Sequence, residues 1–300
     1  MGRVIRRLTE AITSPKNGIE IIVRNTFGRF IPDISYIQLL ALLRFGRKFN
    51  LETPRTFNEK LNWLKLYDRK PQYSLMADKY AVKEFVKNII GDQYVVPCYG
   101  KWNNFDDIDF DKLPTSFVLK CTHDSSGVII CKDKNDFDKS SAKIQINKCL
   151  KKNSYFHSRE WVYKNVPHNI IADMLLDDNS GHELTDYKFL CFNGVPKYMY
   201  CTNKAEDIFE NFYDMDFNPI EINHGFRRHV PEFKCPKEFE LMKELAAKLS
   251  KGIPFVRVDF FDVNHHVYFG EFTFYDWAGL KPFADKKWDD LLGSQILLKQ

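Results

Sequence analysis

Four polar side chains near the carboxyl-terminal end of the sequence have the types and spacing to bind a cation and a phosphate. Arg257, Asp259, Glu271 and Thr273 lie in two aromatic and β-branched runs that a short polar segment separates. This pattern predicts a β-hairpin. Because side chains alternate between the two faces of a strand, a turn centred near His265 would place all four side chains on one face.

The same turn sets Asp259 opposite Glu271, so we expect two carboxylates to face each other across the hairpin. Opposed carboxylates repel, and burying them without a positive charge is costly. A divalent cation whose shell is completed by a phosphate would satisfy both groups. The alternative is an ordinary edge hairpin in which Arg257 neutralises Asp259.

A second candidate phosphate site follows a predicted strand, Phe117 to Cys121. Lys120 lies near the end of that strand, and the polar loop Thr122 to Gly127 joins it to a second strand, Val128 to Lys132. Backbone N–H groups and hydroxyls of such a loop can surround phosphate oxygens while an ammonium neutralises them. An ordinary hairpin loop has the same composition. The chain contains neither a P-loop motif nor a G-x-G-x-x-G motif.

The elements that must position these residues are a mixture of helices and strands. A capping box at Thr56 to Glu59 predicts a helix that ends before Pro71. Further helices are expected over residues 74–90, 135–152 and 238–251, with Lys79 off the apolar stripe of the first. Short strands are expected at 94–97 and 169–176. Asn193-Gly194 predicts a tight hairpin turn between strands 187–192 and 195–200.

The composition is that of an ordinary globular protein, with 44% hydrophobic, 28% charged and 15% aromatic residues in 300. The net charge is only +4, but the first 48 residues hold nine Lys or Arg against three Asp or Glu. Residues 1–50 are expected to form basic amphipathic helices broken near Pro15 and Pro32. They can contact an anionic membrane surface or pack against the body, and packing is favoured. The rest of the chain is slightly acidic, which disfavours nucleic-acid binding.

Cysteine usage and hydropathy indicate a cytoplasmic protein. Seven cysteines are present, none in a C-x-x-C pair, which favours reduced thiols and argues against a zinc site. No apolar run approaches the roughly 20 residues that cross a bilayer. Neither a cleavable signal peptide nor a myristoylation signal is expected, because Arg6 stands where the latter needs Ser or Thr.

Taken together, several segments resemble the ATP-grasp superfamily, and most closely its TupA-like branch, named for teichuronopeptide biosynthesis. They are TFNEKLNWLKLYDR, ADKYAVKEFV, LPTSFVLKCTHDSSG, TDYKFLCFNGVPK, and FVRVDFF with YFGEFTF. The resemblance implies an α+β fold in which two lobes sandwich ATP. It divides the chain into a helical basic region, 1–73, the first part of the core, 74–116, a small lid lobe, 117–176, and a larger lobe with the metal site, 177–300.

The resemblance also assigns roles to individual residues. Arg257 would steady the transferring phosphoryl group, together with Lys120. Asp259 and Glu271 would bind Mg²⁺, and Thr273 stands where relatives commonly have a third ligand, asparagine. The nucleotide would be bound by residues of the lid loop, the hinge strand 171–176 and nearby lysines: Lys79, Lys120, His123, Ser125, Ser126, Gly127, Asp173 and Lys188. Asp124 would repel phosphate unless it turned to solvent or to the metal.

The activity implied is that of an ATP- and Mg²⁺-dependent carboxylate–amine ligase. A carboxylate attacks the γ-phosphate, and an amine then captures the acyl phosphate as an amide. The family suggests that a uronic acid of a cell-surface polysaccharide is joined to an amino acid or amine. These partners, like a membrane contact through residues 1–48, are expectations.

Two rival functions compete with the ligase. Tyr213-Asp-Met-Asp216 contains a D-x-D pattern, so Asp214 and Asp216 are candidate ligands of a glycosyltransferase of the same glycans, with Asp106-Asp107 a weaker candidate. D-x-D is also common in acidic loops. The second rival is a non-catalytic nucleotide-binding protein.

Four further side chains have ordinary interpretations beside their catalytic ones. His123 can donate to a phosphate or be solvated in its loop. His265 and His266 are expected to be exposed in a turn. Cys121 is expected in the core rather than as a nucleophile.

Overall fold

The computed structural model describes residues 15–25, 28–124, 127–203, 209–230 and 232–298. Two antiparallel sheets organise the chain. The smaller has the order β1-β4-β2-β3 and the larger has the order β10-β9-β5-β6-β7-β8. The strands are β1 (Cys98–Trp102), β2 (Phe117–Cys121), β3 (Val128–Cys131), β4 (Ile170–Asp173), β5 (Asp186–Phe192), β6 (Val195–Asn203), β7 (Phe209–Tyr213), β8 (Pro219–Ile220), β9 (Phe255–Val263) and β10 (His266–Thr273).

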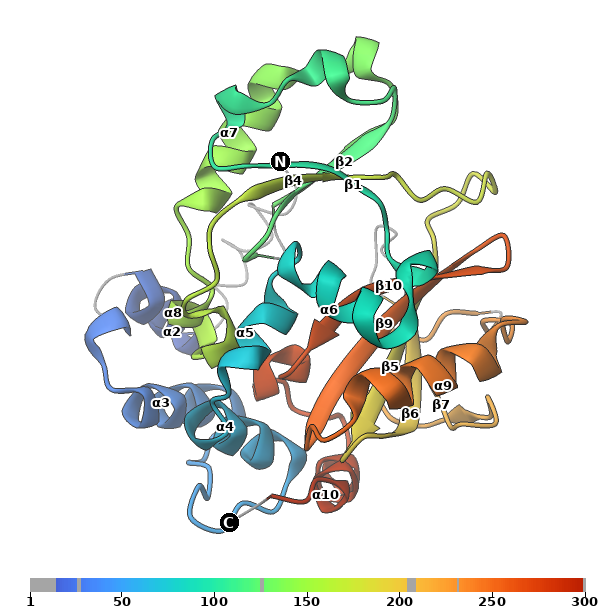
Figure 1. Cartoon of the computed structure of the whole chain (residues 1–300). Coiled ribbons are helices and arrows are strands. Elements are labelled where there is room, and N and C mark those ends of the chain that lie inside the picture. The colour runs from blue at the N-terminus through green and yellow to red at the C-terminus, as the bar shows by residue number, and fades with distance from the viewer. Residues whose placement is uncertain (1–14, 26–27, 125–126, 204–208, 231, 299–300) are drawn as a thin grey trace.

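Helices cover the faces of both sheets that point away from each other. In Figure 1 the smaller sheet and α7 form one lobe above the larger sheet, while α9 lies along the outer face of the larger sheet. The helices are α2 (Pro15–Asn25), α3 (Asp33–Phe45), α4 (Phe57–Tyr67), α5 (Pro71–Ala77), α6 (Ala81–Ile90), α7 (Lys139–Leu150), α8 (Tyr155–Ser158), α9 (Phe239–Ser250) and α10 (Lys286–Gln295). The α+β architecture is therefore confirmed.

Alternation along the strands gives each sheet one apolar core face and one face, here called the polar face, that carries charged side chains among apolar ones. In the smaller sheet Phe117, Leu119 and Cys121 of β2 are fully buried in a core that includes α7, so Lys120 points to the other face. In the larger sheet Phe189 of β5 belongs to the main core beneath α9, and Lys188 beside it faces the smaller sheet. Both polar faces therefore look into the space between the lobes.

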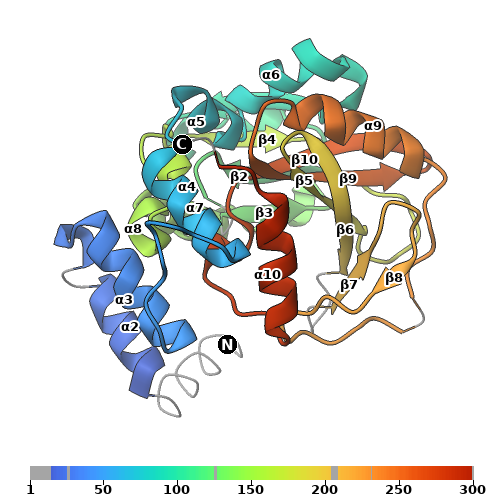
Figure 2. The same cartoon turned by 90° about the horizontal axis from the view of Figure 1, so that it is seen from below.

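The amino-terminal helices pack against the body through α3. Tyr36, Ile37, Leu40 and Ala41 are fully buried, in a cluster that includes Leu280. Figure 2 shows α2 and α3 at one edge of the molecule and α10 beside α4. The apolar stripe expected before Pro15 lies outside the described residues. In the part of the chain that the structure describes, no helix has the length and apolar character needed to span a bilayer.

The capping box at α4 is present as predicted. The Thr56 side chain accepts from the Glu59 amide, and the Glu59 carboxylate accepts from the Thr56 amide. The hairpin turn at Asn193-Gly194 is also confirmed, with φ of 52° and 85°, both in the left-handed region that a two-residue turn of this type needs. The division into 1–73, 74–116, 117–176 and 177–300 stays a prediction. The smaller sheet takes β1 from the second of these segments and β2 to β4 from the third.

Other local expectations were wrong. The helix expected over 74–90 is interrupted between α5 and α6, because the Asp78 carboxylate accepts from the amides of Tyr80 and Ala81 and begins a new helix there. Residues 92–94 form a 3₁₀ turn and not the start of a strand, which begins only at Cys98. The helix expected over 135–152 begins at Lys139, where the Asp138 carboxylate caps it.

The carboxyl-terminal hairpin exists, but its turn is tighter than expected. Asn264 and His265, with φ of 53° and 67°, form a two-residue turn, and His266 pairs with Val263. The register then shifts between Phe269 and Phe272. This bulge restores the spacing that sequence alternation predicted and turns the Glu271 side chain toward the pocket.

Candidate active site

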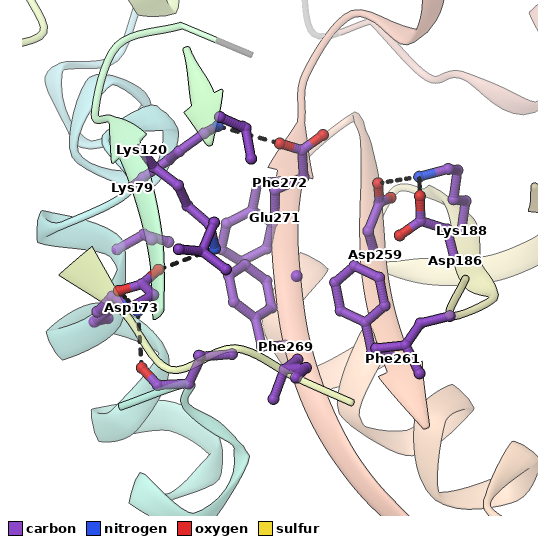
Figure 3. Close-up of a pocket in the computed structure, with 18 of the residues that line it drawn as sticks. Lys79, Lys120, Asp173, Asp186, Lys188, Asp259, Phe261, Phe269, Glu271 and Phe272 are labelled. Atoms are coloured by element: carbon purple, nitrogen blue, oxygen red, sulfur yellow. Dashed lines mark hydrogen bonds and ion pairs between the residues drawn. The ribbon is translucent and has the colours of Figure 1, made fainter. Parts of the chain in front are cut away.

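A cavity of about 510 Å³ lies between the polar faces of the two sheets. Its size is in the usual range for small-molecule sites. One part of its wall is apolar and the other is charged, and Figure 3 shows the charged side chains converging from both lobes. The apolar part includes Val96, Val118, Ile130, Met174, Leu176, Phe261, Phe269 and Phe272. Such a cavity suits a ligand with a flat apolar group and an anionic tail.

The smaller sheet contributes an ion-paired group at the pocket wall. Lys120 Nζ lies 3.0 Å from Asp173 Oδ2, and Lys83 Nζ lies 3.1 Å from Asp173 Oδ1. Lys120 is on β2 and Asp173 at the end of the neighbouring strand β4, on the same face. Burial lowers the pKa of Lys120, and the charge of Asp173 opposes that change. Asp173 therefore stabilises the charged form of Lys120 at the edge of the cavity.

The larger sheet presents a row of side chains on adjacent strands. Lys188 on β5 is directly opposite Tyr200 on β6 and Asp259 on β9. Its ammonium lies 2.9 Å from Asp259 Oδ2 and 3.1 Å from Asp186 Oδ2. Burial would lower the pKa of Lys188, but these two carboxylates outweigh it and the pKa is raised. Lys188 is thus a fixed positive charge within the site.

Arg257 is the most connected side chain of the site. Its guanidinium donates from Nε to Asp259 Oδ1 and from Nη2 to Asp259 Oδ2, both at 2.7 Å, in a bidentate pair. Nη1 donates to Asp276 Oδ1 at 2.6 Å and to the Tyr200 hydroxyl at 2.9 Å. Glu271 Oε1 lies 3.4 Å from Nη2. The pKa of Arg257 is raised well above its usual value because these anionic partners outweigh burial.

Lys79 reaches the site because of the break between α5 and α6. Its backbone amide donates to the Thr122 carbonyl at 3.0 Å, which ties the break to the end of β2. Its ammonium lies 3.4 Å from Glu271 Oε2, across the cavity between the lobes (Figure 3). An uninterrupted helix would not allow this backbone contact. The interruption therefore places Lys79 beside Glu271.

Asp259 and Glu271 fit a Mg²⁺ site that a ligand completes. Carboxylate oxygens are the donors that Mg²⁺ prefers, and one or two carboxylates with phosphate oxygens and water are its usual shell. Within the described ranges no group of three or more His, Cys, Asp or Glu side chains could hold a metal ion. The Thr273 hydroxyl lies 3.5 Å from Glu271 Oε1 and so orients that carboxylate. Its role as a metal ligand stays a prediction.

The loop after β2 does not place His123 against the cavity. His123 is fully buried, stacks on His168 with 3.7 Å between ring centroids, and has Nε2 3.3 Å from the Cys149 carbonyl. Burial lowers the pKa of His123. The expectation that His123 is solvated is therefore wrong, because its imidazole is buried against His168 and Cys149, and its contact with phosphate stays a prediction.

The rest of this loop also turns inward. Asp124 is buried, and its Oδ2 accepts from Cys149 Sγ at 3.0 Å, so it is not turned to solvent. Gly127 packs directly on the sulfurs of Cys149 and Cys121, where a side chain would clash. Cys121 is a core residue, as predicted. Ser125 and Ser126 lie outside the described residues, and the nucleotide-binding role of the loop stays a prediction.

The D-x-D pattern lies in the turn between β7 and β8. The Asp214 carboxylate accepts from the amides of Asp216 and Asn218 and from the Asn218 side chain, which is a common way to build a turn. Neither aspartate lines the cavity. His265 and His266 are exposed, as predicted.

Sequence reasoning missed four side chains of the site: Lys83, Asp186, Tyr200 and Asp276. Asp186 and Tyr200 could have been found, since each shares a strand face with Lys188 or its partner once the hairpin at Asn193-Gly194 sets the register. Lys83 and Asp276 could not, because they reach the site from a helix and a 3₁₀ turn whose positions depend on tertiary packing.

Comparison with known proteins gives one match to a family model. The model described as TupA-like ATP-grasp matches residues 59–297. No curated protein matches the chain.

Similarity to solved structures is low. D-alanine–D-alanine ligase from Helicobacter pylori is 15% identical, with a TM-score of 0.42 and coverage of 81% of this chain and 69% of that one. The same enzyme from Bacillus anthracis, complexed with ATP, is 15% identical, with a TM-score of 0.38 and coverage of 66% and 53%. The ATP-grasp ligase PsnB with its minimal precursor is 10% identical, with a TM-score of 0.40 and coverage of 69% and 54%. The matched region spans about half the length of the last two.

Proposed function

The chain belongs to the TupA-like ATP-grasp family, and we propose that it is an ATP- and Mg²⁺-dependent carboxylate–amine ligase. The observation that carries the proposal is the convergence of Lys79, Lys120, Arg257, Asp259 and Glu271 on one cavity. These side chains come from both lobes, so a ligand between the sheets meets all of them. Cations for phosphates and carboxylates for a metal are what phosphoryl transfer requires.

The nucleotide would lie with its base against the apolar wall and its phosphates against the lysines. Met174 and Leu176 follow β4, and Val118 lies on the adjacent strand β2, so they form an apolar slot for a flat ring. Lys120 at the inner end of β2 would then contact the phosphates. The carboxylate of Asp173 stabilises the charged form of Lys120 for that contact, and a direct contact of Asp173 with the nucleotide stays a prediction.

The reaction proceeds in two steps that these residues serve by position and charge. A substrate carboxylate oxygen attacks the γ-phosphorus and ADP leaves; an amine nitrogen then attacks the acyl carbon and inorganic phosphate leaves. Asp259 and Glu271 would hold Mg²⁺, which neutralises charge on the phosphates. Arg257 donates to the oxygens of the transferring phosphoryl group, and Lys79 and Lys188 add positive charge on either side.

The substrate is proposed to be a uronic acid of a cell-surface polysaccharide, joined to an amino acid or amine. The family assignment supports it. The D-x-D glycosyltransferase is less favoured, because Asp214 builds a turn away from the cavity. A non-catalytic nucleotide-binding protein would have the same cavity and differs only in turnover.

A contact between residues 1–48 and an anionic membrane is proposed as a secondary feature. Arg29, Phe30 and Ile34 are exposed on the amino-terminal helices, beside the excess of basic residues in this segment. Co-sedimentation with vesicles containing phosphatidylglycerol, compared with neutral vesicles, tests it. Equal recovery with both would argue against it.

Release of ADP tests the ligase directly. Purified protein with Mg·ATP is given hexuronates or uronate oligosaccharides together with a panel of amino acids and amines. We expect ADP release that needs both substrates, and a product lighter than their sum by one water. Arg257→Gln should abolish it, while Asp289→Asn, a buried carboxylate that binds Asn58 far from the site, should not. Mg·ATP binding with no substrate-dependent ADP release across the panel would support the non-catalytic alternative.

A further inference from the structure

The turn that carries Asp276 has an unusual backbone that α4 holds in place. Trp277 and Ala278, in the 3₁₀ turn Asp276–Gly279, have φ of 47° and 56°, in the left-handed region that costs free energy for residues other than glycine. Two fully buried side chains of α4 hold it. Lys65 donates to the Ala278 carbonyl and Asn62 to the Gly279 carbonyl, each at 2.6 Å.

The strained turn delivers one carboxylate to the active site. Asp276 is only 2% exposed. Its Oδ1 accepts from Arg257 Nη1 at 2.6 Å and from the Tyr200 hydroxyl at 2.9 Å. Its Oδ2 has no hydrogen-bond partner in the part of the chain that the structure describes. Burying a carboxylate with one oxygen unpartnered costs free energy. The ion pair with Arg257 is the main interaction that offsets this cost.

Two of the carboxylates that contact Arg257, Asp259 and Asp276, are buried, and a bound metal would affect them differently. Asp259 takes two of its hydrogen bonds, at Nε and Nη2, but Asp259 is also one of the two carboxylates suited to Mg²⁺. A divalent cation at Asp259 would withdraw that carboxylate from the guanidinium and repel Arg257. Asp276 does not line the cavity and keeps its contact at Nη1.

We propose that Asp276 is a positioning residue, which holds Arg257 in the cavity when Asp259 turns from the guanidinium to a Mg²⁺-bound nucleotide. The proposal rests on the ligase function above and goes beyond it by assigning Asp276 a part in the binding of the Mg²⁺-bound nucleotide. Without Asp276, the carboxylates left in contact with Arg257 are Asp259 and Glu271, and Asp259 makes the shorter hydrogen bonds. Mg²⁺ must then displace Arg257 from Asp259 although Arg257 has no other buried carboxylate to pair with. The affinity for the Mg²⁺-bound nucleotide therefore falls.

Titration of the full chain with a non-hydrolysable ATP analogue, with and without Mg²⁺, tests this. We expect Asp276→Asn to weaken binding about tenfold with Mg²⁺, the scale of one charged hydrogen bond, and to leave metal-free binding unchanged. In an Arg257→Gln background the same substitution should have no effect, because the two residues act through one contact. Tyr200→Phe, which removes a hydroxyl that donates to Asp276 and accepts from Arg257, should weaken Mg²⁺-dependent binding by about threefold.

The controls separate this proposal from a general loss of structure and from failure of the ligase proposal. Asp289→Asn, at a carboxylate that is also buried but contacts Asn58 of α4, should bind like wild type. Equal weakening by Asp276→Asn with and without Mg²⁺, or weakening that persists in Arg257→Gln, would overturn the positioning role. If Asp276→Asn does not fold, Tyr200→Phe is measured in its place, and equal weakening with and without Mg²⁺ would overturn the positioning role. Wild-type protein that binds no nucleotide would overturn both proposals, whereas normal wild-type binding with an unaffected Asp276→Asn overturns this one alone.

Discussion

The ammonium of Lys120 lies 3.0 Å from the carboxylate of Asp173, across the neighbouring strands β2 and β4. The aspartate is almost fully buried, and Lys83 contacts its second oxygen. One carboxylate thus forms ion pairs with two ammonium groups at the wall of the cavity. A lysine that binds phosphate must be charged, so this pair links the packing of the smaller sheet to the chemistry of the site.

Asp173→Asn should lower the pH at which nucleotide affinity is lost. Burial lowers the pKa of Lys120 from its usual value, and Asp173 opposes this. Lys120 is charged below its pKa and neutral above it, so affinity falls as pH rises through that value. Removing the aspartate lowers the pKa further and moves the loss to lower pH. Titration of the ATP analogue across the alkaline range measures this.

The matched control is Asp106→Asn, which removes an exposed ion pair with Lys143 on the outside of the smaller lobe. It should keep the wild-type pH profile. If Asp173→Asn also kept that profile, Lys120 would not contribute its charge to nucleotide binding.

His123 should make the protein less stable in mild acid. Burial holds its pKa below the usual value, so the unfolded chain takes up a proton near pH 6.5 while the native imidazole stays neutral. The unfolded state then binds more protons, and stability falls as pH falls below about 6.5. His123→Phe, which keeps a ring against His168, should flatten this part of the profile in urea unfolding measured from about pH 8 to about pH 5.

His265→Phe, in the exposed hairpin turn, serves as the comparison and should retain the wild-type slope. A slope that His123→Phe leaves unchanged would mean that other groups cause the acid sensitivity of the fold.

Lys65→Ala should be strongly destabilising. The Lys65 ammonium is fully buried and donates to Asn62 Oδ1, to the Ser158 carbonyl and to the Ala278 carbonyl. Removing it leaves three buried acceptors without this donor, at a cost of about 3 kcal/mol. Lys60→Ala, on the same helix, removes one hydrogen bond to the Ile296 carbonyl and should cost about 1 kcal/mol. Urea unfolding compares the two, and equal losses would contradict the role given to Lys65.

The site hairpin shows what local sequence patterns could predict. Aromatic and β-branched runs with alternating charges identified its strands, and alternation placed Arg257 and Asp259 on the pocket face. The exact register was not predictable, because a tight turn at Asn264 and a compensating bulge before Phe272 cancel each other. The prediction missed both the tight turn and the bulge. Each shifts the register by one residue, in opposite directions, so Glu271 still lies on the expected face.

Features that depend on contacts between distant segments were not predictable. The helix break that directs Lys79 is capped by Asp78, a common helix residue, and is tied down by the Thr122 carbonyl of another lobe. The burial of His123 depends on the ring of His168, far along the chain. Propensity and periodicity describe neighbours in sequence, so neither could reveal these pairings.

The central claim is that Asp259 and Glu271 hold the metal of a nucleotide site between the two lobes. Isothermal titration of the purified protein with a non-hydrolysable ATP analogue, with and without Mg²⁺ and beside a UDP-sugar, tests it most directly. We predict Mg²⁺-dependent binding of the analogue that Asp259→Asn and Glu271→Gln abolish and that Asp214→Asn and Asp216→Asn leave intact. Binding of the UDP-sugar alone, lost in the Asp214 and Asp216 variants, would contradict the account.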